Sequence, residues 1–311
     1  MRFLDVKTDF AFKKVFGSEG SKDILLSFIN AVIHFDGHRI DSLEIIDPYQ
    51  IPLIEGMKDS YVDVKAKLDD GTYVIIEMQV LNVEGLEQRI LYNAAKSYST
   101  QIVKGKKYAS LMPVVALTIT DFIMFNDFND VRSEYRMKEV KHLREYNGDL
   151  RLVFYELPKY TKTIEELKTL EDKWLYFVKE AGSLEIKPAT LASIPEIEHA
   201  LNIANEAGLS CQELEMQHRR QDFIILQQGS IDKAKNDGLN EGRVEGRAEG
   251  LKEGETKGRA EGLKEGETKG RAEERFEARA EIIKHMKAIG ITTDEITRLT
   301  GLSEDEIEKI V

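Results

Sequence analysis

The chain has 311 residues, 41% hydrophobic and 32% charged, which is enough for one sizeable core or two modest ones. Its net charge of −12 argues against nucleic-acid binding through bulk electrostatics, although residues 1–160 carry only −3 of it. No run approaches the ~20 apolar residues of a membrane span, the first residues lack the apolar stretch of a signal peptide, and Cys211 is the one cysteine. We therefore expect a cytoplasmic protein without membrane contact or disulfides.

Residues 1–160 have the pattern of a mixed α/β domain. Apolar residues at helical spacing predict an opening helix from about Asp9 to Val32, on either side of residues 17–21. A second helix is expected from about Glu84 to Val103. The predicted strands are Leu43–Ile46, Tyr61–Leu68, Tyr73–Val80, Pro113–Ile119, Tyr135–Val140 and Leu152–Leu157. This order predicts a sheet flanked by helices.

Three further segments follow the α/β domain. Residues 161–228 show helical spacing, and residues 229–279 form a charged, glycine-rich tail. In this tail a glycine stands at every fourth position from Gly238 to Gly270, and Arg247–Gly258 repeats unchanged as Arg259–Gly270. Each glycine in a helix costs about 1 kcal/mol relative to Ala. We therefore favour a flexible linker here over a helix packed on a partner.

The last segment, residues 280–311, returns to an ordinary helical pattern. Thr292 with Glu295 and Ser303 with Glu306 make two capping boxes, so a small module resembling a helix-turn-helix is expected. Its last helix is acidic and poorly suited to a groove lined by phosphates. We expect this module to mediate homo-oligomerisation, as a dimer, rather than DNA binding.

The segment from Tyr61 to Val80 predicts a β-hairpin, and the length of its loop decides which residues face each other. A two-residue turn would put Asp63 opposite Met78. A three-residue loop ending in a left-handed Gly71 puts Asp63 opposite Glu77. The second register places eight apolar residues on one face, namely Val62, Val64, Ala66, Leu68, Val74, Ile76, Met78 and Val80. We expect it, because a slip of one residue would expose half of that set.

Two carboxylates directly opposite each other on a hairpin can do metal chemistry. Their Cβ atoms lie about 5 Å apart, close enough for Asp63 and Glu77 to share a hard divalent cation such as Mg²⁺. The metal would lower the pKa of a bound water and stabilise the charge that develops during phosphodiester hydrolysis. Gln79 would lie on the same side and could orient water or phosphate. The spacing also fits an amphipathic hairpin with a merely solvated outer face.

Asp63, the glycine-centred turn and Glu77-x-Gln79 resemble the core motif of PD-(D/E)xK nucleases, in the variant with Gln at the usual Lys position. The opening Thr8–Gly17, Arg89-x-x-Tyr92 and the glycine-punctuated tail resemble the recombination-promoting nuclease, or transposase-like, branch of that superfamily. The resemblance implies a restriction-endonuclease-like core and metal-dependent DNA endonuclease activity. The implied cofactor is Mg²⁺, or Mn²⁺ or Ca²⁺, and the implied role is DNA recombination or defence against foreign DNA such as phage.

Other residues are candidates for the same site. Gln79 cannot supply the fixed charge of a lysine. Either Gln79 suffices without it, or Lys65 or Lys13 supplies the charge from nearby, or the site is slow. Asp9, one helical turn before Lys13, is a candidate third metal ligand, or else an N-cap with an i,i+4 partner. Polar residues on the helix after the hairpin are candidate contacts to the DNA backbone, namely Gln88, Arg89, Tyr92, Lys96 and Tyr98.

Three functions remain open on the sequence. The first is a metal-dependent DNA endonuclease. The second is a non-catalytic regulator that binds DNA or protein through a degenerate nuclease core. The third is a strand-transferring transposase, which only the historical naming of the family supports.

Overall fold

The computed structural model describes residues 2–35, 37–50, 60–102 and 105–310. The chain divides into two compact units, Met1–Ile231 and Asp232–Val311. Among the described residues, no helix combines the length and the apolar character that crossing a bilayer requires.

A mixed six-stranded sheet forms the centre of the first unit, in the order β1-β4-β5-β6-β8-β7. Strands β5, β6 and β8 are parallel to one another, and the remaining neighbours pair antiparallel. The strand bounds are β1 Leu43–Ile46, β4 Val64–Leu68, β5 Tyr73–Gln79, β6 Val114–Thr120, β7 Arg132–Arg136 and β8 Leu150–Glu156. Strands β2 (Tyr49–Gln50) and β3 (Ser60–Tyr61) form a separate antiparallel pair.

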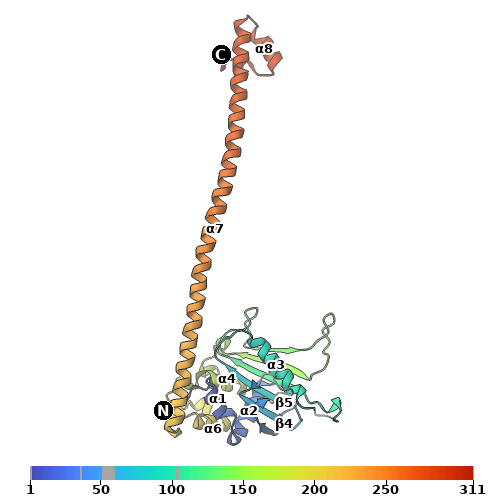
Figure 1. Cartoon of the computed structure of the whole chain (residues 1–311), viewed down its shortest axis with the longest axis vertical. Coiled ribbons are helices and arrows are strands. Elements are labelled where there is room, and N and C mark those ends of the chain that lie inside the picture. The colour runs from blue at the N-terminus through green and yellow to red at the C-terminus, as the bar shows by residue number, and fades with distance from the viewer. Residues whose placement is uncertain (1, 36, 51–59, 103–104, 311) are drawn as a thin grey trace. The chain divides into compact units, whose positions relative to one another are not determined.

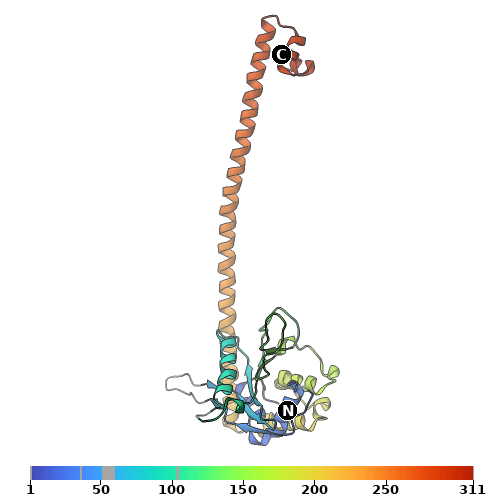
Figure 2. The same cartoon turned by 90° about the vertical axis from the view of Figure 1, so that its right-hand side faces the viewer.

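Helices cover both faces of this sheet (Figures 1 and 2). Apolar residues of the helices on one face join Val64, Ala66 and Ile76 in the main core. These helices are α1 (Asp9–Phe16), α2 (Lys22–Val32), α4 (Leu170–Glu180) and α6 (Pro195–Ile203), with the short α5 (Ala189–Ala192) beside α6. Helix α3 (Leu86–Ser99) packs on the other face against β6 and β8. The predicted sheet flanked by helices is confirmed.

Some predicted elements have different bounds in the structure. The opening helix is interrupted by a 3₁₀ turn at Glu19–Ser21, which separates α1 from α2. The expected strand at Tyr135–Val140 is displaced to Arg132–Arg136. Helix α3 begins after the left-handed Gly85 and ends at Ser99, while Val103 lies outside the described residues. Each difference is one of boundary, and the element types are as predicted.

The expected strand Tyr61–Leu68 is broken by a bend at Asp63. Val62 consequently packs with Ile75 and Ala94, on the α3 side of the sheet, whereas Val64 faces the main core. The prediction that Val62 shares a face with Val64 is therefore wrong. The bend is where the Asp63 side chain accepts a hydrogen bond from the backbone N–H of Met78.

The glycine-rich tail is helical rather than a flexible linker. Helix α7 (Cys211–Ala288) runs through all nine glycines and across both expected boundaries, at 228/229 and 279/280. Intervening Glu, Lys, Arg, Ala and Leu residues favour a helix, and Glu253 pairs with Lys257 one turn later at 3.5 Å. In the described part of the chain, a Cβ at any glycine from Gly238 to Gly270 would have no atom within 4 Å. These glycines therefore make no close approach that would require them.

The C-terminal module has the predicted capped helices. Helices α8 (Thr293–Thr300) and α9 (Glu304–Glu308) each begin with a capping box, at Thr292 and Ser303. Ile283 of α7 packs with Ile296 and Ile307 in a small core of this unit.

Candidate functional site

The hairpin β4–β5 has the predicted register. Val64 pairs with Ile76 and Lys67 with Tyr73. Asp63 lies at the bend just before β4, close enough to Glu77 for its charge to raise the pKa of Glu77. The three-residue loop ends in Gly71, whose φ of 91° is left-handed. A Cβ there would stand 2.1 Å from Met112 Cε, which gives a second reason for glycine. The loop geometry predicted from the apolar pattern is confirmed.

Asp63 is held at the end of β4 by two contacts. Its Oδ2 accepts a hydrogen bond from the Met78 N–H at 2.8 Å, and its Oδ1 lies 3.2 Å from Lys13 Nζ of α1. Burial raises the pKa of the Asp63 carboxyl, and the Met78 hydrogen bond and the Lys13 charge oppose that rise. The Met78 hydrogen bond and the Lys13 charge thus both favour the ionised form of Asp63.

Glu77 lies on β5 beneath α3 and is only 6% exposed. Asn93 Nδ2 donates to its Oε1 at 2.7 Å, and Gln79 Nε2 donates to its Oε2 at 3.1 Å. Burial raises the pKa of the Glu77 carboxyl, and the nearby charge of Asp63 adds to the rise. The buried Glu77 and the largely buried Asp63, whose charges repel, are thus the electrostatic centre of the site.

Arginine and lysine from two helices stand beside these acids. Arg89 of α3 donates to Gln79 Oε1 at 2.6 Å and lies 3.9 Å from Glu77 Oε2. The side chains of Lys13 and Arg89 are each 45% exposed, whereas those of Asp63 and Glu77 are 13% and 7% exposed. An anionic ligand approaching from solvent therefore meets two cations first.

The other predicted residues occupy different surroundings. Lys65 lies half-buried on β4 between Ile46 and Ile75, and burial lowers its pKa. Asp9 forms an ion pair with Arg220 at 2.7 Å. Among the described residues, no three His, Cys, Asp or Glu side chains gather where a metal ion could be held, so Asp9 does not form such a group with Asp63 and Glu77.

The candidate DNA contacts on α3 are not equivalent. Tyr98 donates its hydroxyl to Asp149 Oδ2 at 2.6 Å, and Lys96 is buried with its Nζ 5.6 Å from the ring centroid of Tyr92. Arg89 is the candidate that reaches the acids. The sequence reasoning missed Asn93, although its position one turn after Arg89 places both on the same side of α3.

The first turns of α7 brace α1, the helix that carries Lys13. Glu213 pairs with Lys14, the Gln217 side-chain oxygen accepts a hydrogen bond from the Thr8 hydroxyl at 2.8 Å, and Arg220 pairs with Asp9. Positions 213, 217 and 220 share one face of a helix. Thr8 also caps α1 by accepting from the Ala11 N–H. Gln217 was not predicted, because the contact joins segments 209 residues apart.

A family model described as "PD-(D/E)XK nuclease family transposase" matches residues 6–234. The chain belongs to this family. The matched range includes the hairpin, α3 and the first turns of α7. No curated protein and no solved structure matches the chain. PD-(D/E)XK nucleases generally use divalent metal ions, and the family indicates DNA binding and a nuclease or transposase-like role.

Proposed function

We propose that this chain is a metal-dependent DNA endonuclease, whose centre is the carboxylate pair Asp63 and Glu77. The observation that carries the proposal is that the buried Glu77 and the largely buried Asp63 lie close together, both with raised pKa values, beside the half-exposed cations Lys13 and Arg89. Structural acids are more often exposed or paired one to one with a base. Here Asp63 pairs with Lys13 and Glu77 lies near Arg89, and both carboxyls still have raised pKa values because of their burial.

The donor set fits a hard divalent cation. Asp63 and Glu77 offer carboxylate oxygens, which Mg²⁺ prefers, and a cation between them would relieve their repulsion. Asn93 Oδ1 is buried beside Glu77 and has no hydrogen-bond partner among the described residues, so an acceptor remains for metal-bound water. Asp63 and Glu77 would hold the ion. Bound Mg²⁺, or Mn²⁺ or Ca²⁺, would activate water and stabilise charge on the phosphate.

The surrounding side chains would orient the reactants. Lys13 and Arg89 would bind phosphate oxygens of DNA, since both are accessible and charged. Gln79 and Asn93 would hold the Glu77 carboxylate in one orientation through their amide groups. Lys65 is a second candidate for the charge that a lysine at position 79 would give. Asp9 would join the metal ligands only after leaving Arg220.

The proposed role is DNA recombination or defence against foreign DNA in the cytoplasm, with dimers formed through the C-terminal module. The second candidate is a regulator with a degenerate nuclease core that binds DNA or protein. Gln79 favours this second candidate, because an amide stands where the superfamily usually has a lysine.

Incubation of supercoiled plasmid with the purified full chain tests the proposal. We expect nicking or linearisation with Mg²⁺ or Mn²⁺, and none with excess chelator. Glu77→Gln keeps the shape of the side chain and its acceptor for Asn93 but removes the charge, so it should abolish cleavage. DNA binding without metal-dependent cleavage by the parent would favour the degenerate regulator.

A further inference from the structure

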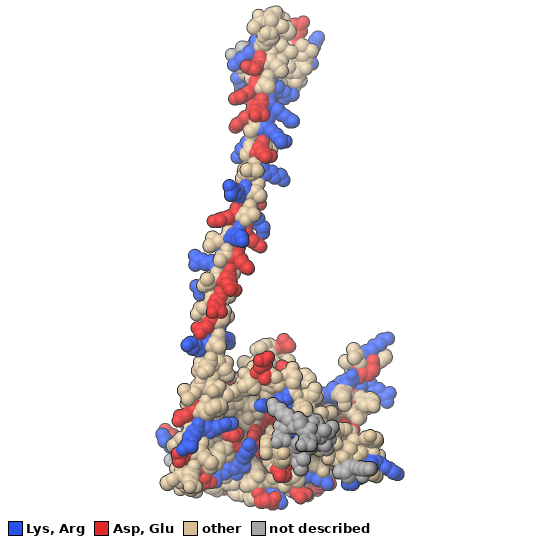
Figure 3. All heavy atoms as spheres, in the orientation of Figure 1, with Lys and Arg blue, Asp and Glu red and all other residues tan. Residues whose placement is uncertain are grey.

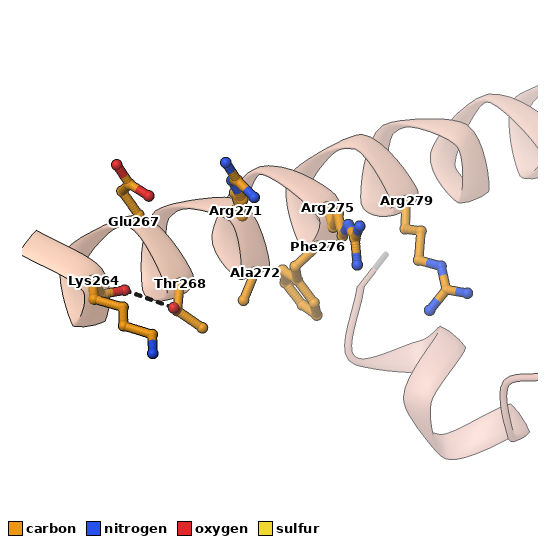
Figure 4. A pocket seen from close by; sticks show the side chains of 8 residues that line it. All are labelled: Lys264, Glu267, Thr268, Arg271, Ala272, Arg275, Phe276 and Arg279. Atoms are coloured by element: carbon orange, nitrogen blue, oxygen red, sulfur yellow. Dashed lines mark hydrogen bonds between the residues drawn. The ribbon is translucent and has the colours of Figure 1, made fainter.

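A basic face lies on α7, within the second unit. An open hollow of about 720 Å³ along the helix is lined by Lys264, Glu267, Thr268, Arg271, Ala272, Arg275, Phe276 and Arg279 (Figure 4). We call Lys264, Arg271, Arg275 and Arg279 the arginine face. Glu267 is the acid among the lining residues, at the margin of this face.

Three acids of this segment lie across the helix from the arginines. Residues four apart on a helix are rotated by about 40° and displaced by about 6 Å, so Arg271, Arg275 and Arg279 stay on one side. Glu273, Glu277 and Glu281 follow each arginine by two residues, which rotates them by about 200° to the opposite side. Basic and acidic side chains can be followed along the exposed length of α7 in Figure 3. A segment with little net charge thus presents a basic surface.

The arginines of this face are available to a ligand. All three are exposed, and across residues 232–310 none of them forms an ion pair. Elsewhere on α7, Arg219 pairs with Glu215 and Lys257 with Glu253 at i,i+4 spacing. Glu267, four residues before Arg271, and Glu274, three residues after it, border the arginine face, but in the described residues no ion pair joins them to it.

The charge pattern discriminates between possible occupants. A second copy related by a two-fold axis would set the arginine face against itself, which like charges disfavour. The phosphate backbone of DNA is complementary to it, and the guanidinium group can hold phosphate oxygens in a bidentate manner. With a net charge of −12, the chain gains little from bulk attraction, so a local basic face would matter for binding.

We propose that the arginine face of α7 binds the backbone of duplex DNA, in addition to any contact at the carboxylate pair. The inference rests on DNA being the substrate of the proposed endonuclease. The inference adds a contact that does not depend on the DNA sequence. The residues of this contact lie outside the range matched by the family model, and they take no part in the chemistry. The contact would raise the time that DNA spends on the protein.

The test is the affinity of the full chain for a fluorescent duplex in excess chelator, over a series of salt concentrations. Arg271→Gln/Arg275→Gln/Arg279→Gln should raise Kd by roughly tenfold or more, and should lower the slope of log K against log salt by about 0.9 per lost phosphate contact. Glutamine has nearly the helix propensity of arginine, so α7 should remain folded. The matched control, Glu273→Gln/Glu277→Gln/Glu281→Gln, should bind as tightly as the parent or more tightly.

Equal Kd values and slopes for the parent and the arginine variant would overturn the proposal. Loss of oligomers in the arginine variant by light scattering, with unchanged DNA affinity, would assign the face to a second copy and would also overturn it. The chelator separates this test from catalysis: a parent that binds with a steep salt slope but never cleaves contradicts the endonuclease alone. A parent that does not bind DNA in chelator contradicts the arginine-face proposal, and plasmid cleavage with Mg²⁺ then decides the endonuclease separately.

Discussion

The side-chain amide of Asn93 donates to Glu77 Oε1 at 2.7 Å, and this bond joins α3 to the strand that carries the candidate site. Asn93 is 1% exposed and Glu77 is 6% exposed, so neither can exchange its partner for bulk water. The orientation of the glutamate therefore depends on a residue that would not itself touch the metal.

Asn93→Ala should lower the rate of metal-dependent cleavage at least tenfold while leaving the affinity for DNA unchanged. The reason is that Glu77 loses a buried hydrogen bond, worth about 1–3 kcal/mol to a charged acceptor. Ser97→Ala is the matched control, because Ser97 lies one turn further along α3 and its buried hydroxyl has no partner among the described residues. Equal losses in the two variants would show that Asn93 has no special role.

Glu77→Gln should stabilise the metal-free protein at neutral pH. The folded state raises the pKa of Glu77 above its ordinary value of 4.5, so this carboxyl lowers stability increasingly as the pH rises above 4.5, and the full cost is reached above the folded-state pKa. The cost is absent below about pH 4.5. Thermal melting should therefore show a gain in Tm near pH 8 that disappears toward pH 4, and added Mg²⁺ should raise the Tm of the parent but not of the variant.

Glu213→Gln should lower the Tm at neutral pH, which is the opposite of the change expected for Glu77→Gln. Hydrogen bonds from Lys14 and Ser210 lower the pKa of Glu213 to about 2. Its ionised form therefore favours the folded state above its ordinary value of 4.5, and the benefit is lost as the pH falls toward 2. The variant should melt slightly below the parent at neutral pH. A higher Tm would contradict the brace between α7 and α1.

Gln217→Ala should reduce cleavage by loosening α1 and thereby displacing Lys13 from Asp63. If the effect passes through Lys13, the same substitution should add little in a Lys13→Met background, which a double-mutant cycle measures. It should also shift the acidic limb of the pH–rate profile upward, because Asp63 would lose the charge that opposes its raised pKa. Arg219→Ala, exposed on the same helix, should change neither property. If the losses of cleavage activity in Gln217→Ala and Lys13→Met add up in the double variant, Gln217 acts on stability alone and not through Lys13.

Deletion of Arg259–Gly270 should leave the oligomeric state unchanged. In the structure it removes 12 residues of α7, or about 18 Å of helix and about 120° of rotation. A Cβ at any glycine of this segment would meet no atom of another part of the described chain, so these glycines make no close packing contact that the deletion would remove. Removing residues 280–311 should instead weaken self-association, because that segment has its own core around Ile296. Light scattering on both deletions measures this, and loss of assembly in the shorter deletion would indicate a packed glycine stretch.

The hairpin was predictable because eight apolar residues constrain its register, and a slip would expose half of them. Val62 is the one residue of the hairpin that was predicted on the wrong face. It lies next to the bend at Asp63, where the Asp63 side chain accepts a hydrogen bond from the Met78 N–H. Asn93 and Gln217 were not predictable, since their contacts depend on how α3 and α7 cross distant segments. The glycine penalty alone does not predict the helical state of the tail, because the Glu, Lys, Arg, Ala and Leu residues between the glycines favour a helix.

Asp63→Asn tests the central claim most directly, by comparing the rate of plasmid cleavage at controlled free Mg²⁺ with that of the parent and of Glu19→Gln. Asn keeps the volume of the side chain but removes a ligand charge, and Glu19 is an acid whose side chain is 72% exposed. We expect the cleavage rate of Asp63→Asn to fall below one hundredth of the parent rate, while Glu19→Gln cleaves at the parent rate. Cleavage by Asp63→Asn at the parent rate would contradict a metal centre at this carboxylate pair.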